Sequence, residues 1–547
     1  MPVGQNFVGL LAATVADITI TRIALPQYFS NRSFTVSASF FFIVNLAILL
    51  VWKLIVYPNY LHPLRNLPGP QTGGRPFLGH ELVAFERPPG RTYYSWMTKI
   101  QNEGLLQFKT LGDRHLLLTD PKALGEVLVT NSYDYQKPQA ARDMLRTTLG
   151  EGLVVAEGDV HRFQRKNVQP TFNFKVIKGL YPMMMAKAIK LTHILEASTT
   201  KDEKGWMSIE MDQWSNRATL DIIGVAGLGR EFNTLRDDKD PLVAIYRLLS
   251  TPTAASLRWF AASLIFGRRL VRALPADFHR VMDETTADLR RICVDMVRDK
   301  KAAVESGRDQ HIDVLSELIR TNNFSDDALV DQLLTFLAAG HETTSSTFSW
   351  VLYELSRRTE IQTALRQEIR TSLPSLQEPL PSDFDLAATL ESMPLLNGVC
   401  QEILRLYPTV SFTRRVAQRE TRILDQAVPK GTTIDISIWA LNRLPALWGP
   451  TADAFDPRRW IETTEDGGER PNKNGGAESN YALMTFLHGP RSCIGQGFAK
   501  AELRVLVASF ISVFEVELTD KNKAVEEFGL VTIKPKDGLP VKIRRAQ

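Results

Sequence analysis

The segment FLHGPRSCIG, Phe486 to Gly495, constrains this chain most, because it sets one cysteine among glycines, a proline and basic side chains. The chain has 547 residues but only three cysteines, Cys293, Cys400 and Cys493, and no two are close enough in sequence to form a CxxC pair. A disulfide framework or a zinc site needs more ligands at closer spacing. Cys493 is therefore a free buried thiol, a nucleophile, or the single thiolate ligand of a metal that brings its other ligands with it.

The residues after Cys493 predict a helix. In IGQGFAKAELRVLVASFISVF, the apolar residues Ile494, Phe498, Ala501 and Val505 share one helical face. A sulfur at a helix start lies near free backbone N–H groups and the positive end of the helix dipole, which favour a thiolate over a thiol. The glycines beside the cysteine allow close approach of a flat body. Haem is such a body, and a cysteine thiolate is one of its known axial ligands.

Phe486, Gly489, Arg491, Cys493 and Gly495 match FxxGxRxCxG, the haem-binding signature of the cytochrome P450 family, and the chain resembles this family. The resemblance implies a mainly α fold with small β-sheets, the cytochrome P450 fold, preceded by an N-terminal transmembrane helix. It also implies that Cys493 is the axial ligand to the iron of haem b (iron protoporphyrin IX), with the other four residues building the loop around it.

The stretch LLTFLAAGHETTSSTFSWVLYEL has helical spacing, but polar residues interrupt its apolar face. Unpaired polar groups are costly to bury, so this cluster is either a kink in which threonine bonds to a backbone carbonyl or a functional site. It resembles the AGxET stretch of the long helix that crosses the haem in the family. The resemblance implies that Ala339 and Gly340 make room for dioxygen and that Glu342 and Thr343 form a proton relay.

In QEILRLYP, Glu402 and Arg405 are three residues apart on one helix face and can pair. Most such pairs lie on the surface and contribute little to stability. Here they resemble the ExxR motif of the family, which is buried and completed by an arginine from a later segment. FDPRRW supplies that arginine as Arg459, with Arg458 where the family usually has an acid.

Haem carries two propionates, which need cationic partners. His161 and Arg165 match the W/HxxxR spacing of the family, Arg415 lies where the family has a propionate-binding arginine, and Arg491 completes the set. Arginine suits this task because its guanidinium binds carboxylates with two hydrogen bonds.

An apolar substrate pocket is expected beside the haem. We expect Phe336, Val410 and Phe412 to contribute to it, and the sequence leaves the substrate, the regioselectivity and the number of oxidation steps open.

The uncharged stretch FTVSASFFFIVNLAILLVW, Phe34 to Trp52, predicts a membrane span, since it can cross about 30 Å of hydrocarbon as a helix. We therefore divide the chain into an N-terminal segment (1–33), an anchor (34–57), a Pro/Gly-rich hinge (58–76) that cannot continue a helix, and a catalytic domain (77–547). Within that domain we expect residues 463–480 to be a disordered insertion.

An earlier apolar segment, Phe7 to Leu25, contains Asp17 and Arg22. It spans the membrane, lies in the interface or packs on the anchor. Asn31-Arg32-Ser33 matches a glycosylation sequon, but it adjoins the bilayer and we expect it to be unused. The resemblance to microsomal members implies a single-pass protein of the endoplasmic reticulum membrane with a cytosolic catalytic domain, and the N-terminus resembles that of fungal members.

The net charge of +4 is too small to suggest a nucleic-acid partner, and no GxGxxG, GxxxxGK[ST] or GxSxG pattern is present. The chain then has no visible site for its own nicotinamide or flavin. The resemblance implies that NADPH-cytochrome P450 reductase delivers electrons from NADPH, with membrane lipid and a lipophilic small molecule as the other partners.

The predicted function is a haem-thiolate monooxygenase that inserts one oxygen atom from O2 into a lipophilic small molecule in secondary metabolism. Two alternatives remain open at this point: a haem-thiolate isomerase or dehydratase that needs no reductase, and a non-catalytic haem sensor. The Glu342-Thr343 pair argues against both, because neither would need a proton relay.

Overall fold

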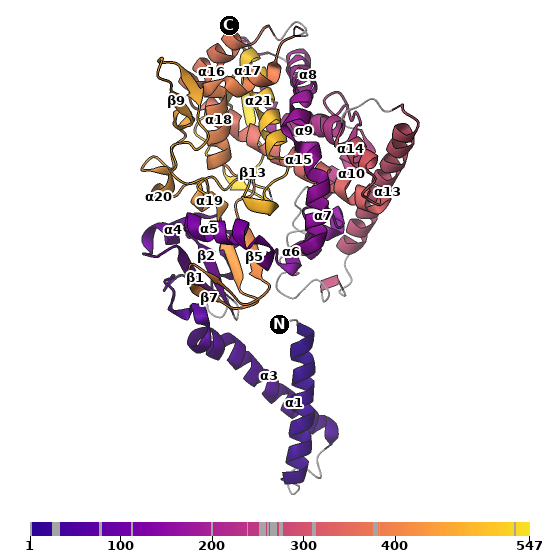
Figure 1. Ribbon diagram of the computed structural model, residues 1–547, viewed down its shortest axis with the longest axis vertical. Helices are drawn as coiled ribbons and strands as arrows, with labels where there is room; N and C mark the ends of the chain where they lie inside the picture. Colours follow the sequence, from indigo (N-terminus) through magenta and orange to yellow (C-terminus); the bar gives the residue numbers. More distant parts are fainter. Residues whose placement is uncertain are drawn as a thin grey trace.

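The computed structural model describes residues 3–24, 33–75, 79–110, 113–198, 201–237, 239–250, 259, 262, 271–272, 277–308, 313–375, 381, 383–529 and 532–547. Figure 1 shows a large helical body with two N-terminal helices projecting from it. The predicted fold class is confirmed: the body is mainly helical and its sheets are small.

The two projecting helices are α1 (Val3–Ala24) and α3 (Phe34–Val51). The helices of the body are α4 (Arg91–Lys99), α5 (Pro121–Gly125), α6 (Gln139–Leu149), α7 (Gly158–Val168), α8 (Phe174–Ser198), α9 (Met211–Leu228), α10 (Pro241–Ser250), α13 (Asp277–Glu305), α14 (Val314–Thr321), α15 (Asp326–Ser356), α16 (Thr359–Ser372), α17 (Leu386–Ser392), α18 (Pro394–Leu406), α19 (Ile438–Leu441), α20 (Pro445–Trp448) and α21 (Gln496–Val513). Shorter or wider helical turns are η1 (Trp52–Leu61), η2 (Pro63–Asn66), η3 (Glu81–Phe85), η4 (Glu126–Thr130), η5 (Ser132–Asp134), η6 (Gln169–Phe172), η7 (Pro457–Trp460) and η8 (Gly489–Arg491).

The largest sheet has the order β1-β2-β8-β5-β3, and only its β2–β8 pair is parallel. Its strands are β1 (Leu105–Thr110), β2 (Asp113–Leu118), β8 (Thr433–Ile436), β5 (Thr413–Ala417) and β3 (Tyr135–Gln136). The second sheet orders β11 (Phe514–Leu518), β14 (Pro540–Arg545) and β4 (Met207–Glu210). The described residues also form three strand pairs: β6 (Thr421–Ile423) with β7 (Gln426–Val428), β9 (Ile461–Thr463) with β10 (Glu469–Pro471), and β12 (Glu527–Phe528) with β13 (Lys534–Pro535).

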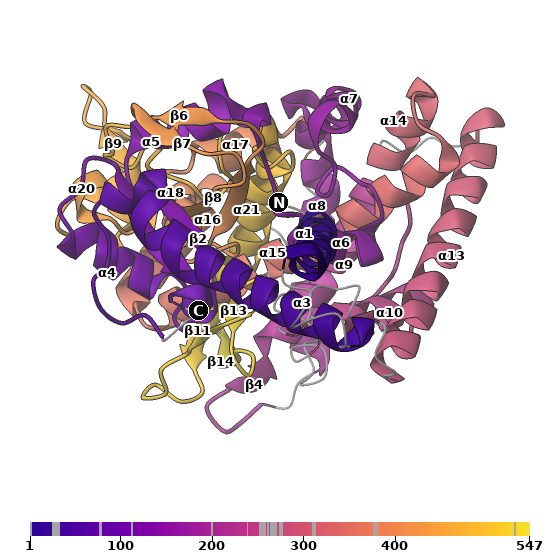
Figure 2. The same ribbon diagram turned by 90° about the horizontal axis from the view of Figure 1, so that it is seen from below.

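Helix α15 lies inside the body, between α9 and α21 (Figures 1 and 2). Ser325 caps its start by accepting a hydrogen bond from the backbone N–H of Ala328 at 3.3 Å, and two acidic residues in the first turn favour the helix dipole. The rings of Phe348 and Phe510 pack 5.7 Å apart between α15 and α21. This packing fixes α21, and with it the cysteine loop at its start, against the central helix.

The N-terminal anchor differs from the sequence prediction at its end. The helix does not stop before Pro58 but continues as the widened turn η1 to Leu61. Proline lacks an N–H and crowds the preceding turn, and a π-type widening relieves that conflict. Asn59 Nδ2 donates to the Ile55 carbonyl at 2.7 Å within the same turn. The domain boundary expected at Pro76–Phe77 lies outside the described residues.

The segment 463–480 is ordered, so the prediction of a disordered insertion is wrong. Strand β10 pairs with β9, and Ala477 and Ala482 are buried in a small core with Trp448 and Trp460. The many glycines and charges of this segment suggested disorder, but its buried Ala477 packs with Ala482, just beyond the segment, against the two tryptophans.

Candidate functional site

The cysteine loop precedes α21 directly. The backbone N–H of Cys493 donates to the Phe486 carbonyl at 2.8 Å, which closes the loop. Gly489 has φ +75°, and a Cβ there would lie 2.1 Å from the Leu128 carbonyl oxygen. Only glycine is compatible with this left-handed turn against η4.

The Cys493 side chain is exposed, whereas Cys293 and Cys400 are buried. Desolvation by the surrounding protein raises the pKa of the Cys493 thiol, while the backbone N–H of Gly495 and the charge of Arg165 lower it. The Cys493 residue is therefore accessible although protein atoms surround its thiol. Burial raises the pKa of each of the other two thiols to about 12, which leaves Cys493 as the one cysteine available for ligation.

Two arginines from the predicted set hold this loop. Arg165 on α7 donates through Nη1 to the Ser492 carbonyl at 2.5 Å, next to the cysteine. Arg491 donates through Nη1 to the carbonyls of Ser132 (2.7 Å) and Tyr135. Arg165 thus binds the loop beside the cysteine, and Arg491 ties the loop to the segment of Ser132 and Tyr135.

A buried carboxylate lies at the centre of the cationic set. Glu157 Oε1 pairs with Lys137 Nζ at 3.1 Å, and Glu157 Oε2 pairs with Arg491 Nη2. Burial alone would raise the pKa of Glu157, but Lys137 and Arg491 lower it. Desolvation lowers the pKa of Lys137 to about 8, despite the opposing effect of Glu157.

Arg415 on β5 adds a further cation to this group. It is 3% exposed, and desolvation together with the charge of Arg491 lowers its pKa to about 10. Among the described residues its hydrogen bonds all leave from Nη1, to Thr413 Oγ1 and to the Arg414 carbonyl, both at 2.8 Å. Nε of Arg491 is buried and has no hydrogen-bond partner in the described part of the chain.

Lys137 and Arg491 thus share the single carboxylate of Glu157, which also attracts the nearby charge of Arg415, so three cations face one anion. Such an excess of buried positive charge is unfavourable unless an anion compensates it. The excess equals the charge of two carboxylates, and unused guanidinium donors are available to bind them. These residues therefore fit the two propionates of a haem.

His161, predicted to assist at the same place, lies in the same group. Its Nδ1 is 3.1 Å from the hydroxyl of Tyr133. Desolvation, with the charges of Lys137 and Arg491, lowers the pKa of His161 to about 4. The imidazole is therefore neutral at physiological pH and offers a hydrogen bond rather than a charge.

The middle of α15 is uncovered at one point. Ala339 is exposed, although most of this helix is buried. A Cβ on Gly340 would lie 2.6 Å from Ile223 on α9, so glycine allows the two helices to approach. Thr343 Oγ1, one turn later, donates to the Ala339 carbonyl at 2.9 Å. The helix therefore presents a small residue and a hydroxyl at this open point.

Glu342 points to a different set of neighbours. Thr532 Oγ1 is 3.5 Å from its Oε2. Burial raises the pKa of Glu342, with Lys534 acting in the opposite direction and Asp212 in the same direction. The structure thus brings Glu342 into a polar group of α9, α15 and β13, beside Thr343 in sequence but with its carboxyl directed to Thr532.

The predicted set of Glu402, Arg405 and Arg459 is brought together. Arg405 donates to Glu402 through Nε at 2.8 Å and Nη2 at 2.7 Å, and Arg459 donates through Nε at 3.2 Å. Trp460 Nε1 also donates a hydrogen bond to the Glu402 carboxylate, at 2.9 Å. Arg405 and Glu402 are both fully buried, so this pair is not the surface pair that its spacing alone would suggest.

The three residues expected in the substrate pocket differ in exposure. Phe336 is 6% exposed and packs against Phe172 at 5.7 Å between ring centroids, within the core. Val410 is 38% exposed and Phe412 is half-buried. Val410 and Phe412 are the two that have substantial accessible surface.

Lys137 and Glu157 were missed by the sequence analysis. They lie in loops outside every motif, before α6 and α7. The only available signal was GLVVAEGDVH, in which an acid directly precedes the helix of His161 and Arg165.

Glu502 was missed as well. It is fully buried on α21, and desolvation raises its pKa well above the ordinary value, with Thr344 on α15 acting in the opposite direction. The sequence did not indicate that Glu502 is buried, because the other buried residues of α21 are mostly apolar.

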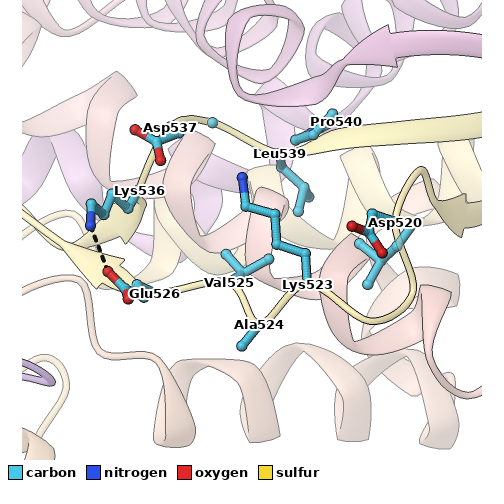
Figure 3. A pocket seen from close by; sticks show the side chains of 11 residues that line it. Asp520, Lys523, Ala524, Val525, Glu526, Lys536, Asp537, Leu539 and Pro540 are labelled. Atoms are coloured by element: carbon cyan, nitrogen blue, oxygen red, sulfur yellow. Dashed lines mark hydrogen bonds and ion pairs between the residues drawn. The ribbon is translucent and has the colours of Figure 1, made fainter.

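A surface hollow near the C-terminus is unrelated to these residues. Figure 3 shows it lined by Asp520, Lys523, Glu526, Lys536 and Asp537, with an ion pair of 2.7 Å between Lys536 and Glu526. It contains none of the predicted site residues and combines charges of both signs, so it offers no competing site.

Comparison with known proteins indicates the family of this chain. The cytochrome P450 family model matches residues 68–541. A cytochrome P450 monooxygenase of Aspergillus fumigatus is 38% identical over 502 residues, with 90% of this chain and 90% of that protein covered. One of Penicillium ochrochloron is 36% identical over 510 residues, covering 92% and 98%. One of Gibberella moniliformis is 35% identical over 514 residues, covering 86% of each.

The fold has a match among solved structures. The crystal structure of the cytochrome P450DA heme domain superposes with a TM-score of 0.69 at 21% identity, covering 88% of this chain and 97% of that one. With a family match over most of the body and relatives above 30% identity along most of the chain, the protein belongs to the cytochrome P450 family and is a haem-dependent monooxygenase, an oxidoreductase that uses O2.

Proposed function

We propose that this enzyme binds haem b through Cys493 and oxidises a lipophilic small molecule, with electrons from NADPH delivered by NADPH-cytochrome P450 reductase. The observation that carries the proposal is the accessible Cys493 sulfur, beside buried cations whose charge exceeds that of their carboxylate by two. Since the relatives reported above are fungal, we extend the proposal to an oxidation in fungal secondary metabolism.

Bound haem would supply the reductive activation of dioxygen and the transfer of one oxygen atom to substrate. Cys493 would ligate the iron, and the Gly495 N–H and Arg165 would stabilise its thiolate. Arg415 and Arg491 would bind the propionates with the donors they leave unused, while Lys137 adds charge and His161 stays neutral. Phe486 and Gly489 shape the loop that holds the sulfur in place.

Thr343 and Glu342 on α15 would donate protons in the reaction. Rotation of the Thr343 side chain would release its hydroxyl from the Ala339 carbonyl and let it donate into the open space beside that alanine. Because burial raises the pKa of Glu342, this carboxyl retains a proton at a higher pH than an exposed glutamate does. The two residues are therefore suited to successive proton donation, a general acid task.

The anchor supports a lipophilic substrate. The helix from Phe34 to Leu61 is 28 residues long, with no part of its most apolar window buried. We place it across the endoplasmic reticulum membrane with the catalytic body in the cytosol, where a reductase and NADPH are accessible. A substrate that partitions into lipid would then reach Val410 and Phe412 from the membrane side.

The test uses the full-length enzyme in membranes that contain the reductase. Cys493→Ala should abolish the thiolate-type Soret band of the ferrous carbonyl complex, and an unchanged band would refute the ligand assignment. Thr343→Ala should keep the band but divert reducing equivalents to hydrogen peroxide, and full coupling in this variant would refute the relay.

The reaction class has its own test. Comparison of metabolites between a producing strain and a strain that lacks the gene would identify the substrate. Turnover of that substrate should require NADPH, whereas NADPH-independent conversion would indicate the isomerase or dehydratase alternative.

A further inference from the structure

Helix α1 has no part in the proposed chemistry, yet it is long enough to matter for the membrane. It has 22 residues, which corresponds to about 33 Å of helix at 1.5 Å per residue. A hydrocarbon core of about 30 Å can be crossed by a helix of this length. Its charged residues are Asp17 and Arg22.

The outward face of α1 is apolar. Val8, Leu11, Val15, Ile20 and Ile23 are 66%, 44%, 59%, 61% and 77% exposed. An interfacial amphipathic helix would carry a charged face on its outer side. Among residues 8–24, whose side chains the structure describes, the exposed polar residues of α1 are Thr19, whose hydroxyl bonds back to the Val15 carbonyl, and Arg22 near the end. The outer face is therefore built for contact with lipid.

The inward face of α1 carries the polar groups. Thr14 is 5% exposed, and Ser37 on α3 is 3% exposed. Asn45 Nδ2 of α3 donates to Asp17 Oδ2 of α1 at 2.6 Å. Polar side chains between helices and apolar side chains outside is the arrangement of paired helices in a bilayer, and an acidic residue inside a membrane is retained only where it has such a partner.

The two helices also meet at the end remote from the body. The guanidinium of Arg22 lies 5.6 Å from the centroid of the Phe34 ring, where α1 ends and α3 begins. Figure 1 shows the start of α1 next to the catalytic body, and in Figure 2 α1 is seen almost end-on while α3 crosses it obliquely. Both helices therefore cover the same depth below the body, in opposite directions.

We propose that α1 is a second membrane span, paired with α3 as an antiparallel hairpin through the Asp17–Asn45 hydrogen bond, so that the N-terminus lies on the same side as the catalytic body. Lipid acyl chains are the partner of the outward face. The inference rests on the proposed anchoring by α3, and it replaces the single-pass topology expected from the sequence.

The test maps both ends of α1 in the full-length protein. A glycosylation acceptor on a long flexible tag is added before Met1 in one version and inserted between Leu25 and Ser33 in another, both carrying Asn31→Gln to remove the native sequon. The hairpin predicts that the inserted acceptor is glycosylated and that the N-terminal one is not. A glycosylated N-terminal tag would overturn the hairpin, and so would an unmodified insertion.

A substitution on the lipid-facing side sharpens the test. Val15→Lys places a charge near the middle of α1, on its exposed face, and should prevent insertion of α1, so that the N-terminal tag changes from unmodified to glycosylated in most molecules. Val15→Leu is the matched control and should leave the tag unmodified. Identical glycosylation in Val15→Lys and Val15→Leu would overturn the lipid-facing assignment.

Carbonate extraction separates this inference from the anchor. A protein that resists extraction but carries a glycosylated N-terminal tag keeps α3 as anchor and loses the second span. A protein that is extracted by carbonate has neither span, and the proposed anchoring fails together with the hairpin.

Discussion

Two of the buried arginine clusters in this protein differ in how fully the chain itself uses their hydrogen-bond donors. Around Glu402, the Arg405 guanidinium donates to the carboxylate and to the carbonyls of Asn442, Ala452 and Ala454. Arg459 donates a second set of contacts to this cluster, with its Nε bound to the Glu402 carboxylate. The two guanidiniums exceed the single carboxylate by one charge, but every nitrogen of Arg405 and Arg459 donates to an acceptor within the chain.

Around Glu157 the cations outnumber the carboxylate by two, and some guanidinium donors are unused. Lys137 and Arg491 share one carboxylate, Arg415 lies close by with unused donors, and burial lowers the pKa of each cation. A complete cluster, whose donors are all used within the polypeptide, stabilises the fold. An incomplete cluster, with unused donors and excess positive charge, is suited to binding a ligand that supplies anions.

The largest expected effect is in the complete cluster. Arg405→Ala would leave the Glu402 carboxylate buried and without its main partner, which costs about 3–5 kcal/mol, a large part of the total stability of a protein. We expect little soluble, haem-loaded protein, measured as purified yield and as thermal unfolding of what remains.

The control is Arg458→Ala, on the neighbouring residue. Arg458 pairs with Glu469 at 3.3 Å, but its side chain is 70% exposed, so its loss should change stability by less than about 0.5 kcal/mol. Equal effects of the two substitutions would remove the distinction between the buried cluster and a surface pair.

The next effect is in the incomplete cluster and should depend on haem. Arg415→Met removes a buried cation with few partners, so the haem-free protein should unfold at the same or a higher temperature than the wild type. In the haem-loaded protein the lost guanidinium contact is worth about 1.5–3 kcal/mol, or roughly 10- to 100-fold faster transfer of haem to an acceptor protein. Destabilisation of the haem-free protein by this substitution would show that Arg415 has a structural role like that of Arg405.

A pH dependence sharpens the same comparison. The pKa of Lys137 is lowered to about 8 by desolvation, against about 10.4 in an unfolded chain. Between these values the unfolded state binds more protons than the folded state, so stability rises with pH. The haem-free protein should therefore gain stability from about pH 8 to pH 10, by at most about 3 kcal/mol, relative to Lys137→Met. Identical pH profiles of the two proteins, measured by denaturant unfolding, would contradict the depressed pKa.

The sequence predicted the groups that lie in compact motifs. Cys493 and its loop, and Glu402 with Arg405, are each set by spacing within one turn or one helix, so their contacts follow from local geometry. Arg459 could be added because its segment resembles that of a known family. The sequence did not predict Lys137 and Glu157, whose role depends on loops brought together by the fold.

The misses in secondary structure have similar causes. Composition indicated that helix would end at Pro58 and that order would be absent from 463–480, but tertiary contacts decide both. The Pro58 carbonyl accepts from Arg114 Nε at 2.6 Å, and Trp460 packs on Ala477 and Ala482.

The smallest effect concerns the edge of the incomplete cluster, where Arg165 reaches Cys493. Arg165 lowers the pKa of the thiol, so Arg165→Ala should raise that pKa and slow alkylation of Cys493 by iodoacetamide at pH 8 in the haem-free protein. The slowing should be roughly two- to tenfold, the range expected for the loss of one neighbouring charge.

Cys293 and Cys400 are buried, so the alkylation rate reports on Cys493. Arg162→Ala is the matched control on the same helix, because Arg162 pairs with Asp159 at the surface. If both variants react at the wild-type rate, Arg165 only binds the Ser492 carbonyl and does not lower the pKa of the Cys493 thiol.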